Sequence, residues 1–537
     1  MNGPANVRVI VVVVAAALVA AACSSGGGNA LPASTTTAAT ASTTAVATTV
    51  TSTILIASTS AASSTTVRAD GARFEKFAPC PEPPFHQKWL CATLDVPIDR
   101  ADPSAGTIPL AVYALVHTDQ SKPAQEPLFT TPGGPGYPGF ANYGLWALQK
   151  RLFAHHDIVT IDPRGTGHSR AINCPDVQYS PIPLAMMTTA QWETARANVA
   201  ACAAQLGTAS GRYGAVDRAA DVEDVRKLLG YDTIDYYGGS YGSVDLQAYA
   251  YRYPEHLHAV VLDSGFPVSA GGPDYGAFFG VGVPQANIDV IALACARAPE
   301  CHRMDPDPAK TLVDLVHQVR DHPVTIAPSG TTAKIVINEA VLASLILDNG
   351  HPLKFVIDAD VARSGDFGLI ETFLASPGSP ERVQDDSIGD NMAGNCTDYD
   401  TPWDRSDPID VRARKLAAAE AALPDDAFFP LSKHAWFANN PPDICISWPA
   451  PARHEAVVPA GASARTVPAL ILSGDLDGGI PAFVSKRLLS EFPSATFVLI
   501  AGAGHQTLAF GTCAARLAAR FFDTLTAGDT SCAKKPS

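Results

Sequence analysis

Basic residues are scarce in this chain of 537 residues. Its 38 lysines and arginines are outnumbered by 53 aspartates and glutamates, which gives a formal charge of -15. Phosphate backbones repel a chain of that charge, so nucleic-acid binding is disfavoured. The cysteines include no Cys-x-x-Cys pair with matching histidine spacing, so the sequence predicts neither a metal site nor another cofactor. Hydrophobic residues make up 47% and charged residues 17%, the balance of a folded globular protein.

The N-terminus has the pattern of an export signal. Arg8 precedes an apolar run over residues 9–22 that is too short to cross a bilayer as a helix but suits a signal peptide, which we assign to residues 1–22. The run ends at Cys23, and Ala20 to Cys23 resembles the lipobox of bacterial lipoproteins. We expect a lipid on Cys23 that holds the protein on the outer face of the cell membrane. Secretion after cleavage nearby and an uncleaved anchor are the alternatives, and each of them also exports the chain.

Residues 23–66 consist mainly of serine, threonine, alanine and glycine. Such a segment cannot bury enough apolar surface to fold, so it is interpreted as a flexible tether.

The cysteine count agrees with an oxidising compartment. If Cys23 carries a lipid, ten of the 11 cysteines remain, an even number that allows full pairing. Sequence alone does not fix connectivity, but proximity along the chain suggests five pairs: Cys80 with Cys91, Cys174 with Cys202, Cys295 with Cys301, Cys396 with Cys445, and Cys513 with Cys532.

Short apolar runs alternate with helical patterns after the tether. This alternation predicts an α/β fold in which helices cover a mostly parallel sheet. Apolar residues also recur at helical spacing over residues 216–229. The expected strands are residues 128–131, 157–161, 233–237, 259–262, 469–472 and 496–500.

Directly after the expected strand 233–237, Gly238-Gly239-Ser240-Tyr241-Gly242 is the only G-x-S-x-G in the chain. A sharp strand-to-helix turn needs glycines around its central residue and leaves the Ser240 hydroxyl at the head of the sheet. The helix start aims N–H groups at any oxyanion formed there, so the Tyr241 N–H is a candidate donor. The alternative is a turn whose serine only caps a helix.

A second glycine-rich turn follows the expected strand 128–131. Thr131-Pro132-Gly133-Gly134-Pro135-Gly136 lies where this kind of fold places the other half of an oxyanion hole, and we expect the Gly134 N–H to be the donor. The stretch from Gly134 to Gly139 also fits G-x-G-x-x-G, with Asp157 at a suitable distance for a ribose. Two prolines remove N–H groups that a phosphate needs, which disfavours a dinucleotide site.

The expected base and acid come from the C-terminal strands. His505 follows strand 496–500 and is the candidate general base; His155, His156 and His168 are weaker candidates because they lie near the strand 157–161. Asp477 is the preferred acid to orient it. Asp475 and Asp263 also follow strands and stay open as alternatives. A carboxylate that does not orient the histidine would instead cap backbone N–H groups. The order serine, aspartate, histidine is that of α/β-hydrolases.

These motifs together resemble the prolyl iminopeptidase and tripeptidyl aminopeptidase family of α/β-hydrolases, particularly its secreted bacterial members. The likeness runs from about Cys80 to Cys532 and includes the segment from Asp162 to Ser169. Carried over residue by residue, the family triad falls on Ser240, Asp477 and His505. The chain departs from the family in the loop after Asp477, which reads Gly-Gly-Ile-Pro where members commonly show Thr-Pro.

The resemblance implies a cap inserted between strands. We therefore expect a hydrolase core over residues 67–265 and 460–537 and a mainly helical cap over residues 266–459, with helical patterns at 309–319 and 411–422. It also implies a serine aminopeptidase that holds the substrate's ammonium group, for which Asp398 is a candidate. The alternatives are a carboxylesterase or lipase with the same triad, acting on esters or lipids, and a non-catalytic envelope binding protein.

Overall fold

The computed structural model describes residues 73–81, 87–141, 145–178, 189–268, 280–326, 335–347, 359, 362, 365, 382–437, 441–451, 453–462 and 465–535. The expected signal peptide over residues 1–22, Cys23 and the tether over residues 23–66 lie outside these residues. Over the described part of the chain, every helix is too short or too polar to span a bilayer.

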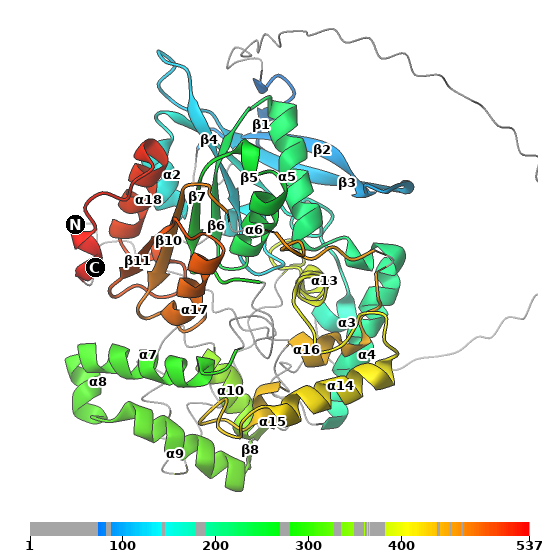
Figure 1. The fold of residues 1–537 in the computed structure, drawn as a ribbon, viewed down its shortest axis with the longest axis vertical. Helices are drawn as coiled ribbons and strands as arrows, with labels where there is room; N and C mark the ends of the chain where they lie inside the picture. The colour runs from blue at the N-terminus through cyan, green and yellow to red at the C-terminus, as the bar shows by residue number, and fades with distance from the viewer. Residues whose placement is uncertain are drawn as a thin grey trace, which may run out of the picture.

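A nine-stranded sheet forms the centre of the fold (Figure 1), with the order β1-β2-β3-β5-β4-β6-β7-β10-β11. The pairs β1/β2, β2/β3 and β3/β5 are antiparallel, and every pair from β5 to β11 is parallel. The strands are β1 (Ala78–Pro79), β2 (Leu90–Asp99), β3 (Asp102–Leu115), β4 (Gln125–Thr131), β5 (His156–Ile161), β6 (Ile234–Gly239), β7 (Leu257–Asp263), β10 (Ala469–Gly474) and β11 (Thr496–Ile500).

Helices cover both faces of the sheet because successive strand residues point to opposite faces. Tyr236 of β6 packs into the apolar cluster that includes α5 and α6, while Tyr237 packs into the cluster that includes α2 and α18. The covering helices are α2 (Leu145–Leu152), α5 (Ala215–Leu229), α6 (Gly242–Arg252), α17 (Ala482–Lys486) and α18 (Cys513–Thr524). The short 3₁₀ helices are η2 (Gly139–Ala141), η4 (Gly207–Gly211), η5 (Pro254–His256), η7 (Cys445–Ser447), η8 (Arg487–Ser490), η9 (Thr507–Ala509) and η10 (Ser531–Lys534).

The α/β class and the parallel sheet predicted from the sequence are confirmed. Each of the six expected strands corresponds to an observed strand, β4, β5, β6, β7, β10 or β11, and the expected helix over 216–229 is α5. The sequence did not reveal the antiparallel β1-β2-β3 extension. Most side chains of β2 are only partly buried, so this strand lacks the continuous apolar run by which a central parallel strand is recognised.

Between β7 and β10 the chain builds a largely helical insertion, which lies below the sheet in Figure 1. Its helices are α7 (Val283–Arg297), α8 (Pro299–Met304), α9 (Pro308–Asp321), α10 (Glu339–Leu347), α13 (Ile388–Asp398), α14 (Ile409–Ala422), α15 (Lys433–Phe437) and α16 (Pro441–Ile444), and β8 (Val324–Ile326) pairs with β9 (Ile335–Ile337). Two earlier helices, α3 (Pro175–Gln178) and α4 (Thr189–Leu206), join this layer, since α4 packs against α16 and η7.

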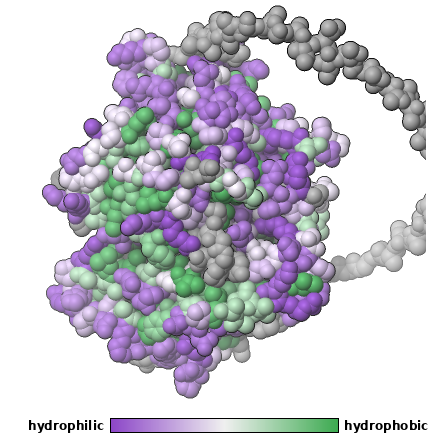
Figure 2. Space-filling model, in the orientation of Figure 1, coloured by the Kyte–Doolittle hydropathy of each residue, from purple (hydrophilic) through white to green (hydrophobic). Residues whose placement is uncertain are grey.

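Apolar surface flanks the junction between the sheet and helices α7–α10, as Figure 2 shows. Exposed large apolar side chains around this junction include Leu499 of β11, Phe483 of α17 and Leu293 of α7. One ion pair also crosses the junction, because both guanidinium nitrogens of Arg297 on α7 reach the Asp475 carboxylate after β10, at 2.9 and 2.6 Å. Exposed apolar side chains therefore border the junction on this side, and one two-point ion pair crosses it.

The five disulfides predicted from proximity are confirmed: Cys80–Cys91, Cys174–Cys202, Cys295–Cys301, Cys396–Cys445 and Cys513–Cys532. The partners of each pair are at most 49 residues apart. Each bond therefore ties together segments that fold close to one another.

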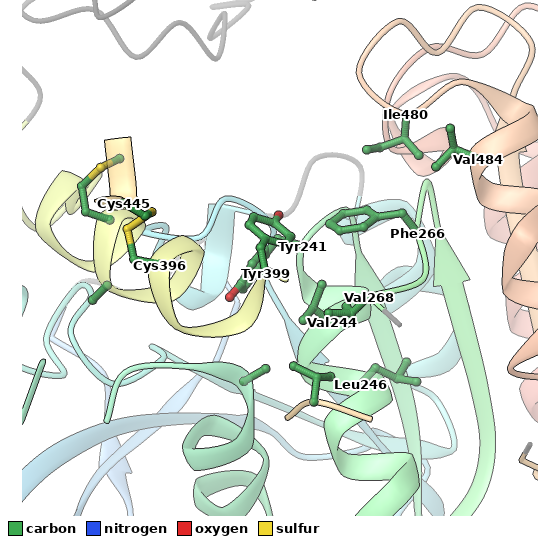
Figure 3. Packing of buried hydrophobic residues seen from close by; sticks show 14 of the residues in the cluster. Tyr241, Val244, Leu246, Phe266, Val268, Cys396, Tyr399, Cys445, Ile480 and Val484 are labelled. Carbon is green, nitrogen blue, oxygen red and sulfur yellow. A yellow bond between two sulfur atoms is a disulfide. The ribbon is translucent and has the colours of Figure 1, made fainter. Parts of the chain in front are cut away.

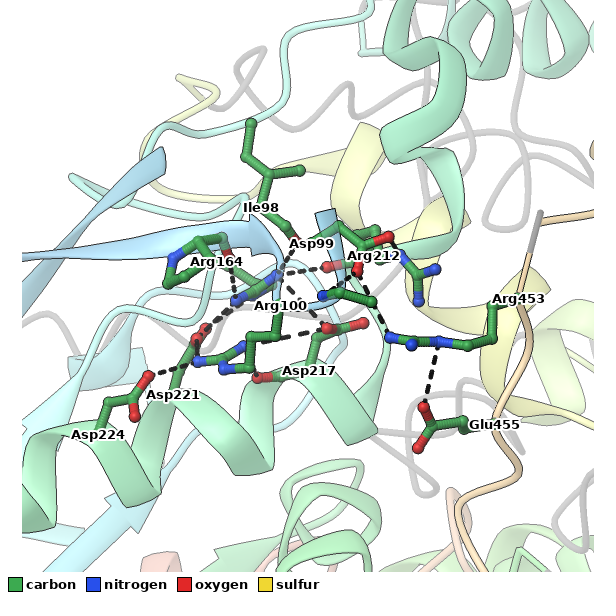
Figure 4. A network of polar contacts seen from close by, with 12 residues as sticks. Ile98, Asp99, Arg100, Arg164, Arg212, Asp217, Asp221, Asp224, Arg453 and Glu455 are labelled. Atoms are coloured by element: carbon green, nitrogen blue, oxygen red, sulfur yellow. Dashed lines mark hydrogen bonds and ion pairs between the residues drawn. The ribbon is translucent and has the colours of Figure 1, made fainter. Parts of the chain in front are cut away.

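A buried arginine joins the β2–β3 extension to helix α5 (Figure 4). The Arg164 guanidinium binds both carboxylate oxygens of Asp221 at 2.7 and 2.6 Å. It also donates to the carbonyl oxygens of Ile98 and Arg212 at 3.0 and 2.9 Å. Arg164 is fully buried, so these acceptors replace the water it has lost. The network is stable only while both partners remain.

We predict that Arg164→Met lowers the free energy of unfolding by about 3 to 5 kcal/mol, because it removes the buried donor to Asp221 and to the Ile98 and Arg212 carbonyls and leaves Asp221 with Arg100 as its partner. Urea unfolding with the disulfides intact would measure this loss. Arg382→Met is the control, since Arg382 forms an exposed pair with Asp385 three residues away, and it should change stability by less than about 0.5 kcal/mol. Equal effects of the two substitutions would contradict the prediction.

Candidate active site

Ser240 lies in a sharp turn between β6, which ends at Gly239, and α6, which begins at Gly242. Its φ of 53° is unusual for a residue with a side chain. The turn is tight because a Cβ atom added at Gly238 would lie 2.4 Å from the Gly242 carbonyl oxygen, and one at Gly242 would lie 2.7 Å from that of Thr131. Only glycine fits at these two positions, and the serine side chain is directed out of the turn.

His505 and Asp477 lie beside this serine. The Nε2 atom of His505 is 2.9 Å from the Ser240 Oγ, and its Nδ1 atom is 3.0 and 3.1 Å from the two carboxylate oxygens of Asp477. Asp477 is fully buried. In this arrangement the imidazole can accept a proton from the hydroxyl while the carboxylate orients the ring.

The loop after β10 holds Asp477 in place. The backbone N–H of Ile480 donates to the Asp477 carboxylate at 2.7 Å. A Cβ atom added at Gly479 would lie 3.2 Å from Nδ1 of His505, so a side chain there would press on the imidazole. The glycine at position 479 therefore leaves room for the ring.

The two alternative acids bind other groups. Asp263 accepts hydrogen bonds from the Thr507 backbone and hydroxyl at 2.9 and 2.8 Å and from the Tyr237 hydroxyl at 3.0 Å. Asp475 binds Arg297 and accepts from the Gly502 backbone N–H at 2.8 Å. Asp263 thus fixes the loop that carries His505, and of the three expected carboxylates only Asp477 is hydrogen-bonded to the ring.

The other candidate histidines lie elsewhere. His156 is buried, with Nε2 3.0 Å from the Asp523 carboxylate. The exposed His168 contacts the Tyr113 hydroxyl through Nδ1 at 3.1 Å, and His155 is 3.8 Å from the Asp119 carboxylate. Among the residues that the structure describes, no group of three or more metal-ligating side chains gathers.

The loop from Gly133 to Gly136 approaches the serine through Gly133. A Cβ atom added at Gly133 would lie 3.0 Å from the Ser240 Cβ and 3.0 Å from the Gln506 Nε2, whereas one at Gly134 would meet Tyr137 and Gly136. Gly133 is therefore a neighbour of Ser240 that the sequence pattern did not single out. Gln506 is a second such neighbour, although its position directly after His505 was a usable signal.

Asp398, the candidate for holding a substrate ammonium group, is buried at the end of α13. Its carboxylate accepts from the Ala215 backbone N–H at 3.1 and 2.9 Å and from the Tyr241 hydroxyl. A carboxylate already surrounded by protein donors is not available to a ligand. Asp398 instead supports the side chain of Tyr241, the residue that follows Ser240 in the turn.

Opposing effects act on the His505 pKa. Burial disfavours the charged ring, but the attraction and hydrogen bond of Asp477, with a contribution from Asp263, raise the pKa above its usual value. A neutral ring is needed to accept a proton from Ser240. Any reaction that uses His505 as a base is therefore lost as the pH falls through this raised pKa.

Comparisons with known proteins agree with this geometry. Residues 127–312 match the family model described as alpha/beta hydrolase fold, and residues 431–532 match the one described as TAP-like protein. The chain is 27% identical over 424 residues to serine protease Hip1 of Mycobacterium tuberculosis, across 73% of this chain and 77% of that protein. Ser240 lies in the first matched segment, and Asp477 and His505 lie in the second.

Two further relatives differ in their named activity. The chain is 31% identical over 189 residues to the tripeptidyl aminopeptidase of Streptomyces coelicolor, across 32% of this chain and 34% of that protein. It is 28% identical over 403 residues to carboxylesterase B of Mycobacterium tuberculosis, across 69% of this chain and 73% of that protein. The relatives therefore include both a peptidase and an esterase by name.

We predict that Asp477→Asn lowers the pKa of His505, because the neutral amide no longer stabilises the imidazolium. An NMR titration of the isotope-labelled His505 imidazole would measure this pKa. Asp475→Asn is the matched control in the same loop and should leave the His505 pKa unchanged. An unaltered pKa in the Asp477 variant would show that this carboxylate does not govern the ring.

Proposed function

We propose that this chain, a member of the α/β-hydrolase family, is an exported serine peptidase. It releases short peptides from the free N-terminus of its substrates. The 2.9 Å contact between Ser240 Oγ and His505 Nε2 carries the proposal. Similarity to a named serine protease and a named tripeptidyl aminopeptidase supports peptide substrates.

In the first step the Ser240 oxygen attacks the carbonyl carbon of the scissile peptide bond. His505 accepts the hydroxyl proton on Nε2, and the imidazolium is stabilised by Asp477, 3.0 Å from Nδ1. The carbonyl oxygen becomes an oxyanion near the start of α6. Because the N-terminal end of a helix carries partial positive charge and free N–H groups, this position favours the oxyanion.

The tetrahedral intermediate then collapses. The bond to the leaving nitrogen breaks, the nitrogen takes the proton from His505, and the acyl group stays on Ser240. Water attacks the ester carbonyl and gives its proton to His505. The bond to the Ser240 oxygen then breaks, that oxygen takes the proton back from His505, and the peptide acid is released. The backbone N–H of Tyr241 and an N–H of the loop at Gly133 and Gly134 are the proposed oxyanion donors.

Export is the second part of the proposal. Five disulfides suit an oxidising compartment, and such bonds are rare in reducing ones. The pattern that ends at Cys23 supports export through a signal peptide, with the lipid on that cysteine as the membrane anchor. The lipid would tether the enzyme at the outer face of the membrane.

A carboxylesterase is the second candidate function, favoured by the similarity to carboxylesterase B over 403 residues. The same serine, histidine and aspartate would hydrolyse an ester by the same two steps. The two functions differ in the groups that bind the substrate around the reacting carbonyl.

We predict that Ser240→Ala lowers kcat by more than about 10⁴-fold, because the nucleophile is lost, and abolishes labelling by a fluorophosphonate probe. Ser243→Ala is the matched control, since the Ser243 hydroxyl lies one turn further along and accepts from the Phe266 backbone at 3.3 Å. This control should be labelled normally. Undiminished labelling of the Ser240 variant would refute the assignment.

A comparison of three substrates would separate peptidase from esterase. We expect a tripeptide amide with a free amine to be hydrolysed with a kcat/KM about ten to a hundred times that of its N-acetyl form, because acetylation removes a charged hydrogen-bonding group. A short-chain nitrophenyl ester is the third substrate. Equal rates for both peptides, with much faster ester cleavage, would favour the carboxylesterase.

A further inference from the structure

Helix α13 of the insertion contacts the glycine-rich loop beside Ser240. The Ser387 backbone N–H, at the start of this helix, donates to the Gly136 carbonyl oxygen at 2.9 Å. The Asn391 side-chain amide donates to the Pro135 carbonyl oxygen at 2.8 Å. The first turn of α13 therefore holds the backbone that directly follows Gly133 and Gly134.

The last turn of the same helix contacts the other side of the site. The Tyr241 hydroxyl donates to the Asp398 carboxylate, and the Tyr241 ring packs edge-on against Tyr399 at 6.2 Å (Figure 3). Tyr241 directly follows the nucleophile and lies at the N-cap of α6. Its side chain is therefore held by the end of α13.

Close approach between the helix and the site depends on a glycine. A Cβ atom added at Gly394, midway along α13, would lie 3.0 Å from the Pro135 Cγ and 3.1 Å from the Tyr241 hydroxyl oxygen. One surface of α13 is thus packed against the glycine-rich loop and the serine turn together.

Helix α13 is itself firmly anchored. Its buried Asp390 pairs with the buried Arg218 of α5 at 2.7 Å. The Cys396–Cys445 disulfide ties it to η7, and Arg405 donates to the carbonyl oxygens of Thr397 and Tyr399 at its end, both at 2.8 Å. A helix fixed in these ways can hold the groups that contact it.

We propose that α13 positions both sides of the oxyanion hole, with Asp398 acting through Tyr241 and Asn391 acting through Pro135. This inference rests on the proposed function, since it assigns the oxyanion donors to the Tyr241 backbone and the glycine-rich loop. Asp398 and Asn391 are positioning residues and do not touch the substrate. The insertion then contributes to turnover and does more than cover the site.

The experiment compares Tyr241→Phe, which removes only the hydroxyl and keeps the backbone N–H, with Tyr249→Phe. Tyr249 is the matched control, a buried tyrosine on α6 whose hydroxyl donates to Glu223 at 2.9 Å. Full loss of an oxyanion donor costs about 10²- to 10³-fold in kcat, so misplacement should cost about tenfold. We expect this fall in kcat for Tyr241→Phe, with KM changed less than about twofold, and a kcat near the parent's for Tyr249→Phe.

A peptide boronic acid gives an independent readout because it forms a tetrahedral adduct with an active serine. Its inhibition constant should rise by the same factor as kcat falls in Tyr241→Phe and in Asn391→Ala, because the adduct needs the same donors. Asn198→Ala is the control for the second variant, since Asn198 donates to the Asp176 carbonyl on the exposed surface at 3.1 Å.

The outcomes are distinguishable. If Ser240→Ala is inactive but Tyr241→Phe and Asn391→Ala keep the parent's kcat and boronic acid affinity, the positioning role is overturned while the proposed function stands. The positioning role is also overturned if Tyr249→Phe loses as much activity as Tyr241→Phe. If Ser240→Ala stays active, the proposed function itself fails. Should Tyr241→Phe not fold, the Asn391 variant and its control decide.

Discussion

The tight packing of the Ser240 turn against the end of β4 is the constraint on which the site depends. Gly238 and Gly242 meet neighbouring backbone so closely that neither could carry a side chain. This contact forces Ser240 into a backbone conformation that few residues with side chains adopt. The helix α6 then starts immediately behind the hydroxyl, and the end of β7 holds the loop that brings His505 to it.

Carboxylates around the site have separate structural tasks. Asp477 binds the His505 ring, Asp263 holds the backbone after that ring, and Asp475 joins the loop to the insertion through Arg297. Burial favours the neutral form of Asp263 and raises its pKa, although hydrogen bonds from Thr507 and Tyr237 oppose this. Each carboxylate is therefore held by a different set of donors, most of which come from other elements of the fold.

Buried charge also links distant parts of the chain. Arg164 ties the β2–β3 connection to α5 through Asp221, and Arg218 of the same helix ties α5 to α13 through Asp390. Burial raises the pKa of Asp390 to about 6, although Arg218 opposes the shift. Such pairs are sensitive to the loss of one partner, because the remaining charge has no water to replace it. Helix α5 is thus the common support of the sheet extension and the insertion.

The sequence by itself determined the parallel strands, the serine turn and the histidine after the last strand, and proximity along the chain indicated the five disulfides. Each of these is local, because an apolar run, a glycine-flanked serine or two nearby cysteines carry their meaning over a short stretch of chain. Only the tertiary structure decided which of Asp477, Asp475 and Asp263 lies beside His505. All three follow strand ends, and the strand order β7-β10-β11 brings all three near the loop that carries His505. The course of the loop after β10 then directs Asp477 to the ring and Asp475 to Arg297 and Gly502. The tertiary structure also decided that Asp398 supports the Tyr241 side chain. That contact joins residues 157 positions apart and depends on how the insertion packs.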